Sequence, residues 1–186
     1  MSISITFVLF IVCFLLHKYL ILPIEIFIFS QETIEYASLL YLPYAVRIIC
    51  YFVLGTTVLI PIFLSQCFTY IVFNNADLTN TVYLSCLSTS SIFLGFRLYE
   101  LVRKRNIFNI DKTVDWKKII IVGFLVSIFN STLSSIFISL NTSYNYFYKS
   151  LNFTYLIGDV LGLVFGMFLF IFCIILYKSW GINVRS

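Results

Sequence analysis

The sequence predicts an all-α integral membrane protein, a polytopic helix bundle of about six segments, and three observations support this. Hydrophobic residues make up 61% of the chain and charged residues 11%, whereas a soluble domain has about 25% charged residues. The mean hydropathy is +1.01. Apolar runs long enough to approach the ~20 residues of a membrane-spanning helix alternate with short polar stretches. We therefore expect one membrane domain over residues 1–186.

The first segment is expected at about 5–29, with His17 and Lys18 interrupting it and Pro23 kinking or ending it. No basic residue precedes this run and no small-residue cleavage site follows it, so we expect a retained helix rather than a signal peptide. The stretch Gln31 to Tyr41 is polar enough to lie at the membrane interface.

The stretch from Pro43 to Phe73 is too long for one span. A single helix of this length would measure ~45 Å against a membrane core of ~30 Å. Gly55 and Pro61 lie near its middle, where a helix would break. We expect two short antiparallel helices at about 43–54 and 60–73; a single span is the alternative.

Three further segments complete the bundle. They are expected at about 82–101, 119–140 and 153–177, because each is an apolar run bounded by polar residues. The polar stretch Asn74 to Asn80 is a short turn before the first of them. A Tyr-rich loop from Asn141 to Ser150 precedes the last.

The basic residues predict the orientation of the bundle. Six of the 12 Lys and Arg residues lie between residues 103 and 118, namely Arg103, Lys104, Arg105, Lys112, Lys117 and Lys118. Beside a membrane helix, the positive-inside rule explains this cluster better than nucleic-acid binding does. The loop is then cytoplasmic, and with six segments both termini are cytoplasmic too. A five-span arrangement would instead place the acidic stretch Gln31–Tyr41 in the cytoplasm. The excess of Ile, Phe, Tyr and Asn over Ala and Gly is typical of an AT-rich genome, which suggests a bacterial protein and therefore a bacterial inner membrane.

Arg47 and Asp159 are the candidate functional pair. Each lies in a stretch apolar enough for the membrane core, where a charge is costly and usually finds a partner in the protein interior. Both are expected toward the outer ends of their helices, so we predict that they pair as a ligand site or a structural contact. The alternatives are that Asp159 caps a helix N-terminus and that Arg47 extends to the membrane surface.

Two sets of residues are candidates for pocket lining or helix packing. Glycines recur every fourth residue in the last segment, which lets another backbone approach closely. Small polar residues recur at helical spacing in the fifth segment, where interhelical hydrogen bonds or a polar cavity are expected. The glycines are Gly158, Gly162 and Gly166, and the polar residues are Ser127, Asn130, Ser131, Ser134 and Ser135.

The residue content argues against an enzyme. His17 is the single histidine, so sites that need two histidines, such as bis-histidine metal sites, lack residues. The five cysteines are dispersed and form no CxxC motif, so we expect neither a metal nor a cofactor. His17 and Glu25 are about two helical turns apart. They are either ordinary interfacial residues or a proton-handling pair.

Several short motifs resemble the bacterial membrane-associated sensor domain, a family found ahead of histidine kinases and diguanylate cyclases. The resemblance covers about residues 36–175. Its motifs are Leu42-Pro43-Tyr44-Ala45-Val46-Arg47, Leu54-Gly55, Pro61-Ile62-Phe63-Leu64, Asn130 and Leu156-Ile157-Gly158-Asp159-Val160-Leu161-Gly162. The last contains the Gly-Asp-x-x-Gly signature of the family. Thr56 and Thr57 replace the basic residues that the family often has after the equivalent glycine.

The resemblance implies a non-enzymatic sensor-like module that binds a small ligand or a protein partner. Members of the family carry a cytoplasmic output domain after the last span, whereas this sequence ends at Ser186. Signalling would then need a separate protein. The alternative is a transport component, such as the substrate-binding membrane subunit of a vitamin importer, which would dock on an energising protein. In both cases the lipid bilayer surrounds the protein, and no nucleic acid is expected as a partner.

Overall fold

The computed structural model describes residues 2–29, 38–103, 116–141 and 148–179, and every element within these ranges is helical. The predicted all-α class is therefore confirmed. Four stretches are long and apolar enough to cross a membrane, namely Ser4–Ile28, Pro43–Asn74, Trp116–Leu140 and Asn152–Cys173. The count of about six spanning segments stays a prediction.

The N-terminal arm consists of α1 (Ser2–Leu16), a π-helical turn η1 (His17–Ile21) and α2 (Leu22–Phe29). The π-turn has a local cause in Pro23. Proline lacks an N–H, and its ring clashes with the carbonyl four residues earlier, here that of Tyr19. A wider turn, in which the Leu22 N–H bonds to the His17 carbonyl, relieves this clash without ending the helix.

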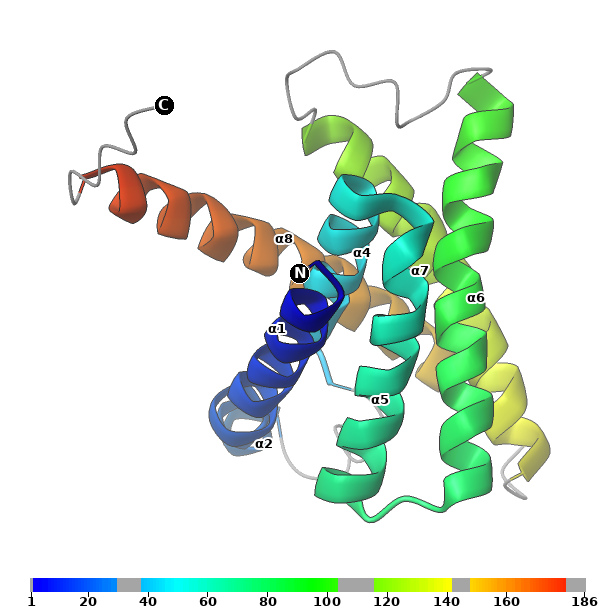
Figure 1. Ribbon diagram of the computed structural model, residues 1–186. Coiled ribbons are helices and arrows are strands. Elements are labelled where there is room, and N and C mark those ends of the chain that lie inside the picture. Colours follow the sequence, from blue (N-terminus) through cyan, green and yellow to red (C-terminus); the bar gives the residue numbers. More distant parts are fainter. Residues whose placement is uncertain (1, 30–37, 104–115, 142–147, 180–186) are drawn as a thin grey trace.

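The predicted break near Gly55 is confirmed. Helix α4 (Pro43–Leu54) leads through a 3₁₀ turn η2 (Gly55–Val58) into α5 (Leu59–Asn74). Gly55 has φ 71° and ψ −152°, a conformation essentially restricted to glycine. The chain reverses direction here, as Figure 1 shows. The reversal brings Tyr41, before α4, to the same cavity as Tyr70 near the end of α5.

Three long helices follow: α6 (Leu78–Arg103), α7 (Trp116–Asn141) and α8 (Tyr148–Ser179). The turn before α6 uses Asn75 in the left-handed conformation, and Asp77 accepts hydrogen bonds from the first amides of α6. Helix α7 packs against both α6 and α8. Helix α8 also contacts α4, and Figure 1 shows it running obliquely across the bundle. Helix α6 is not among the four candidate spans. Its Ser and Thr residues, together with the charged residues near its C-terminus, lower its hydropathy.

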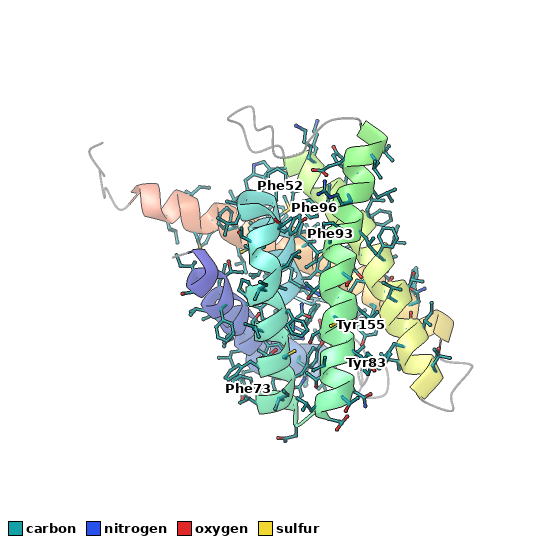
Figure 2. All side chains as sticks on the ribbon, turned by 45° about the vertical axis from the view of Figure 1, so that its right-hand side comes forward. Phe52, Phe73, Tyr83, Phe93, Phe96 and Tyr155 are labelled. Atoms are coloured by element: carbon teal, nitrogen blue, oxygen red, sulfur yellow. The ribbon has the colours of Figure 1, made fainter. Side chains whose placement is uncertain are left out.

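The apolar core is formed mainly by α1, α4, α6 and α7, with further residues from η2, α5 and α8, and aromatic side chains fill much of it. Tyr51 of α4 contacts Phe96 of α6 with ring centroids 4.3 Å apart. In Figure 2, Phe52 and Phe96 lie toward one end of the bundle and Phe73 and Tyr83 toward the other.

The distribution of polar residues matches a membrane environment rather than water. Ser85, Ser127 and Ser135 are fully buried, whereas Leu101 and Leu140 are 75% and 80% exposed. In a soluble protein these positions would be reversed, because apolar surface is driven from water. Here the apolar residues face outward and the small polar residues face each other, which lipid favours on both counts.

Candidate functional site

Arg47 and Asp159 lie together in the interior, as the sequence predicted. Nη2 of Arg47 is 3.7 Å from Oδ1 of Asp159, and their side chains are 4% and 2% exposed. Both alternative interpretations are wrong. Asp159 does not cap its helix, since α8 begins at Tyr148 and Asp159 lies well inside it. Arg47 does not reach the bundle surface, since it is buried in α4.

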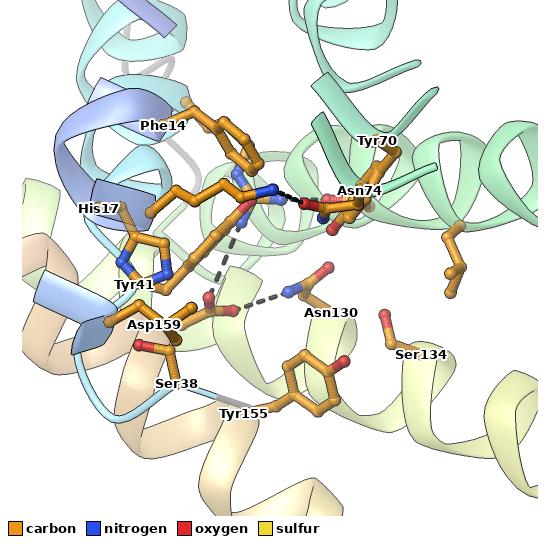
Figure 3. Close-up of a pocket in the computed structure, with 15 residues that line it drawn as sticks. Phe14, His17, Ser38, Tyr41, Tyr70, Asn74, Asn130, Ser134, Tyr155 and Asp159 are labelled. Carbon is orange, nitrogen blue, oxygen red and sulfur yellow. Dashed lines mark hydrogen bonds and ion pairs between the residues drawn. The ribbon is translucent and has the colours of Figure 1, made fainter. Parts of the chain in front are cut away.

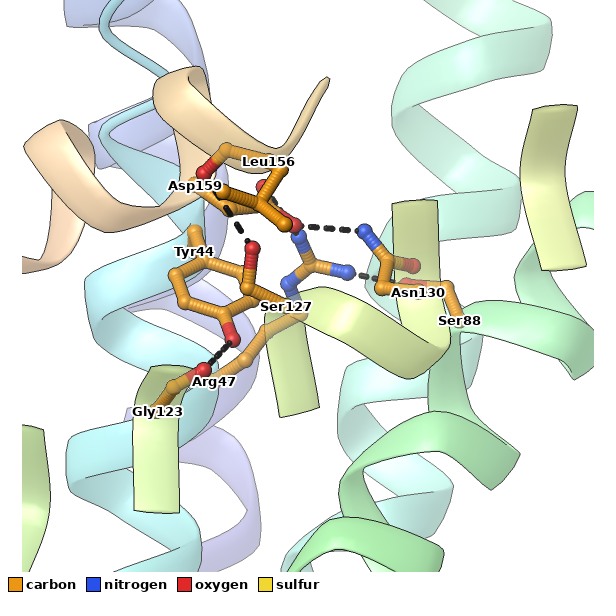
Figure 4. Close-up of polar contacts among 8 residues, drawn as sticks. All are labelled: Tyr44, Arg47, Ser88, Gly123, Ser127, Asn130, Leu156 and Asp159. Atoms are coloured by element: carbon orange, nitrogen blue, oxygen red, sulfur yellow. Dashed lines mark hydrogen bonds and ion pairs between the residues drawn. The ribbon is translucent and has the colours of Figure 1, made fainter. Parts of the chain in front are cut away.

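Helices α6 and α7 complete the coordination of this pair. Nδ2 of Asn130 donates a hydrogen bond of 2.7 Å to Oδ2 of Asp159. Nη1 of Arg47 donates to Oγ of Ser88. Figure 4 shows the four side chains converging from four different helices. The pair therefore couples α4 and α8 to α6 and α7, and its geometry depends on the whole bundle.

Two neighbouring hydrogen bonds hold these helices in register. The hydroxyl of Tyr44 donates to the carbonyl of Gly123. Oγ of Ser127 donates to the carbonyl of Leu156 at 3.2 Å. Both bonds join α7 to a helix that carries one member of the ion pair, so they fix α7 between Arg47 and Asp159 (Figure 4).

Aromatic rings frame the guanidinium group of Arg47. Its Cζ lies 4.9 Å from the ring centroid of Tyr44 and 5.4 Å from that of Tyr41. Such cation–π contacts gain strength where water is excluded. Within the described residues, however, the buried Nε of Arg47 has no hydrogen-bond partner. The guanidinium is thus held in place with part of its hydrogen-bonding capacity unused.

The ion pair borders a partly open cavity of about 230 Å³. Every helical element except the short turn η2 contributes residues to the wall, as does the chain before α4. Most of the side chains in the wall are polar (Figure 3). The lining consists of Phe14, His17, Lys18, Leu22, Ser38, Tyr41, Arg47, Tyr70, Asn74, Leu84, Ser88, Asn130, Ser134, Tyr155 and Asp159. Such a polar cavity inside an apolar bundle is where a small ligand would bind.

The glycine ridge of α8 serves backbone packing. A Cβ added at Gly158 would lie 2.1 Å from the carbonyl oxygen of Ser38, and one at Gly162 would lie 2.2 Å from that of Tyr41. At Gly166 it would meet the Cβ of Ala45 at 2.2 Å. The amide of Tyr41 also donates to the carbonyl of Gly158 at 3.0 Å. The ridge thus lets the chain leading into α4 lie directly on α8.

The same chain segment is fixed from the other side by the N-terminal arm. Oε2 of Glu25 accepts hydrogen bonds from Oγ of Ser38 at 2.7 Å and from the amide of Leu39 at 3.2 Å. The ring of His17 meets that of Tyr41 edge-on, with centroids 5.2 Å apart. His17 and Glu25 are both buried within the protein. Together with α8 they position the Tyr41 side chain at the cavity.

The polar residues of α7 have different roles. Asn130 and Ser127 make the interhelical bonds described above, and Ser134 lines the cavity. Ser131 and Ser135 instead donate to carbonyls of their own helix. The two expectations for this stripe, hydrogen bonding and cavity lining, thus apply to different members of it.

Several residues that line the cavity were not predicted from the sequence. Ser88 belongs to a buried polar series in α6, with Thr81 and Ser85, whose spacing of four and three residues would have revealed it. Tyr70 and Tyr155 have no such signal, because tyrosines occur throughout this chain. Their assignment to one cavity needs the three-dimensional arrangement.

A scan against protein-family models and searches of curated proteins and of solved structures find no match for this chain. Within the described ranges, no group of three or more His, Cys, Asp or Glu side chains is arranged to hold a metal ion. Polar groups around an ion pair are suited to binding and orienting a ligand.

Proposed function

We propose that this protein is a non-enzymatic membrane module that binds a small ligand in the cavity beside Arg47 and Asp159. The observation that most supports this proposal is that the buried ion pair borders a partly open polar cavity instead of packed protein. A buried pair that served stability alone would be expected to have all its hydrogen bonds made. The unused Nε of Arg47 is consistent with a site built for a further partner.

The placement of the cavity supports a role in detecting or receiving an external molecule. Asn74 and Leu84 line it from either side of the α5–α6 turn, and Ser134 and Tyr155 line it near the α7–α8 connection. Under the orientation that the basic 103–118 cluster implies, this end faces outward. We propose that the protein lies in a bacterial inner membrane with both termini in the cytoplasm. A sensor-like role would act through a signalling partner in the cytoplasm.

A library experiment tests ligand binding. The protein in lipid nanodiscs would be screened with small polar molecules by thermal shift, and hits confirmed by native mass spectrometry. Ser134→Trp should abolish binding because the indole fills the cavity. The control Ser90→Trp places the same ring on the exposed face of α6 and should leave binding intact. Hits that survive Ser134→Trp, or no hits at all, would refute the proposal.

The alternative, a transport component, has one observation in its favour. Nε2 of Gln66 in α5 and Oγ of Ser85 in α6 are buried, without hydrogen-bond partners among the described residues. Such groups inside the bundle would suit a polar solute that moves deeper than the cavity. Uptake of a confirmed ligand into proteoliposomes, with and without a co-purified energising protein, distinguishes the two. Binding without uptake in either preparation favours the sensor-like role.

A further inference from the structure

Among the described residues, the lining of the cavity carries an excess of positive charge. Lys18 and Arg47 are its two basic side chains, and Asp159 is its one carboxylate. His17 adds no negative charge in either protonation state. Glu25 does not line the cavity, and its Oε2 accepts hydrogen bonds from Oγ of Ser38 and the amide of Leu39. Since Arg47 and Asp159 balance each other, the charge of Lys18 is left over within the lining.

Lys18 is held at the cavity by neutral groups. Its Nζ donates to the carbonyl of Phe73 and, at 3.0 Å, to Oδ1 of Asn74. Both acceptors lie at the C-terminus of α5, where the helix dipole favours a positive charge. Within the described residues no carboxylate lies within 4.0 Å of Lys18. An ammonium group has one more hydrogen than these two bonds use, and it remains for another acceptor.

Arg47 also has spare capacity for an anion. Its separation of 3.7 Å from Asp159 exceeds the length of a charge-assisted hydrogen bond, ~2.7–2.9 Å. Asp159 instead receives its short hydrogen bond from Asn130. Within the described part of the chain, the single hydrogen bond of the guanidinium is the one to Ser88. A guanidinium that is positioned by rings but weakly paired is suited to bind a carboxylate.

We propose that the cavity binds a small organic anion whose carboxylate is held by Lys18 and Arg47. The phenol groups of Tyr70 and Tyr155, which face the same cavity, would contact the rest of the molecule (Figure 3). A carboxylate carries the single negative charge that the lining lacks, whereas a phosphoryl dianion would be repelled by Asp159. The inference rests on the proposed function and names its ligand class.

The size of the cavity limits the ligand. A volume of about 230 Å³ lies below the ~300–1,000 Å³ typical of drug-sized sites. It corresponds to the space of roughly seven to eight water molecules at ~30 Å³ each. Simple aliphatic or single-ring carboxylates fit within this volume, and larger ligands such as nucleotides do not.

Matched pairs of carboxylates and amides test the inference. Butyrate and benzoate would be compared with butyramide and benzamide by titration calorimetry, in nanodiscs of zwitterionic lipid. At least one carboxylate is expected to bind about tenfold or more tightly than its amide, which is a difference of ~1.4 kcal/mol in binding free energy. Lys18→Met should remove this preference. The control Arg97→Met removes a cation that does not line the cavity and should preserve it.

The outcomes separate this inference from the proposed function. Amides that bind as well as carboxylates, with both abolished by Ser134→Trp, would leave a ligand-binding site but overturn its anion specificity. If no carboxylate binds, the inference is also wrong. The proposed function is then decided separately, by the library screen described above. Nanodiscs containing phosphatidylglycerol provide a further arm. If that lipid displaces benzoate from the wild-type site, the anion that the site selects is a lipid phosphate, and the inference is wrong.

Discussion

Arg47 of α4 and Asp159 of α8 form an ion pair of 3.7 Å although 112 positions separate them in the sequence (159 − 47). Asn130 and Ser88 link the pair to α7 and α6. Four helices therefore meet at one polar centre, and this centre borders the cavity. We therefore expect both the stability of the bundle and the proposed binding to depend on the same few side chains.

The first prediction concerns the coupling of this pair. Arg47→Ala and Asp159→Ala should each lower the stability in detergent by ~3–5 kcal/mol, because either change leaves a buried charge without its partner. The double variant should lose less than the sum of the two. Thermal unfolding monitored by intrinsic fluorescence measures all three. Strictly additive losses would show that the two residues are energetically independent.

The second prediction concerns the glycine ridge of α8. Gly162→Ala should destabilise the protein by ~1–3 kcal/mol, because the new methyl group would lie 2.2 Å from the carbonyl oxygen of Tyr41, part of a fixed backbone. It should also weaken binding, since Tyr41 lines the cavity. Leu161→Ala, at an exposed position of the same helix, is the control. A neutral Gly162→Ala melting curve would mean that the two backbones do not touch.

The third prediction concerns the turn between α4 and α5. Gly55→Ala should cost ~1–3 kcal/mol, because a side chain is strained at φ 71° and ψ −152°. Thr56→Ala, at the exposed neighbouring position, should have little effect. Thermal melts of the two variants give the comparison. If Gly55→Ala melts like the wild type, α4 and α5 form a continuous helix instead of a hairpin.

The fourth prediction concerns orientation in the membrane. In a cysteine-free background, a cysteine at Asn145 should react with an impermeant maleimide in whole cells, and one at Asn109 should react only after lysis. The reason is the concentration of Lys and Arg between Arg103 and Lys118, which favours the cytoplasm. Both positions lie outside the described residues, so labelling is the direct measurement. The reverse pattern would invert the topology and place the cavity on the cytoplasmic side.

Much of the secondary structure could be predicted because it depends on local chemistry. The hairpin helices were expected at 43–54 and 60–73 and occur at Pro43–Leu54 and Leu59–Asn74. Gly55 and Pro61 specify this break by their own backbone properties. The π-turn at His17–Ile21 was not foreseen in this form, since Pro23 predicts a disturbance but not how the chain accommodates it.

The candidate site was predictable only in part. Arg47 and Asp159 were identified because a charge in an apolar stretch is costly, and a shared helix end suggested that they pair. Asn130 and Ser134 followed from helical spacing. The sequence did not indicate that Lys18 and Tyr41 reach the same cavity, because each lies in a different part of the chain.

By itself, the sequence determined the membrane class, the helical content and the two charges that need a partner. These follow from hydropathy, backbone preference and the cost of a charge in lipid, which are properties of single residues and their neighbours. Only the tertiary structure decided that the glycine ridge receives the chain around Ser38 and Tyr41, and that the described residues of the cavity wall carry an excess of positive charge. Such features depend on which helix faces meet, and that is settled by the packing of all the helices at once.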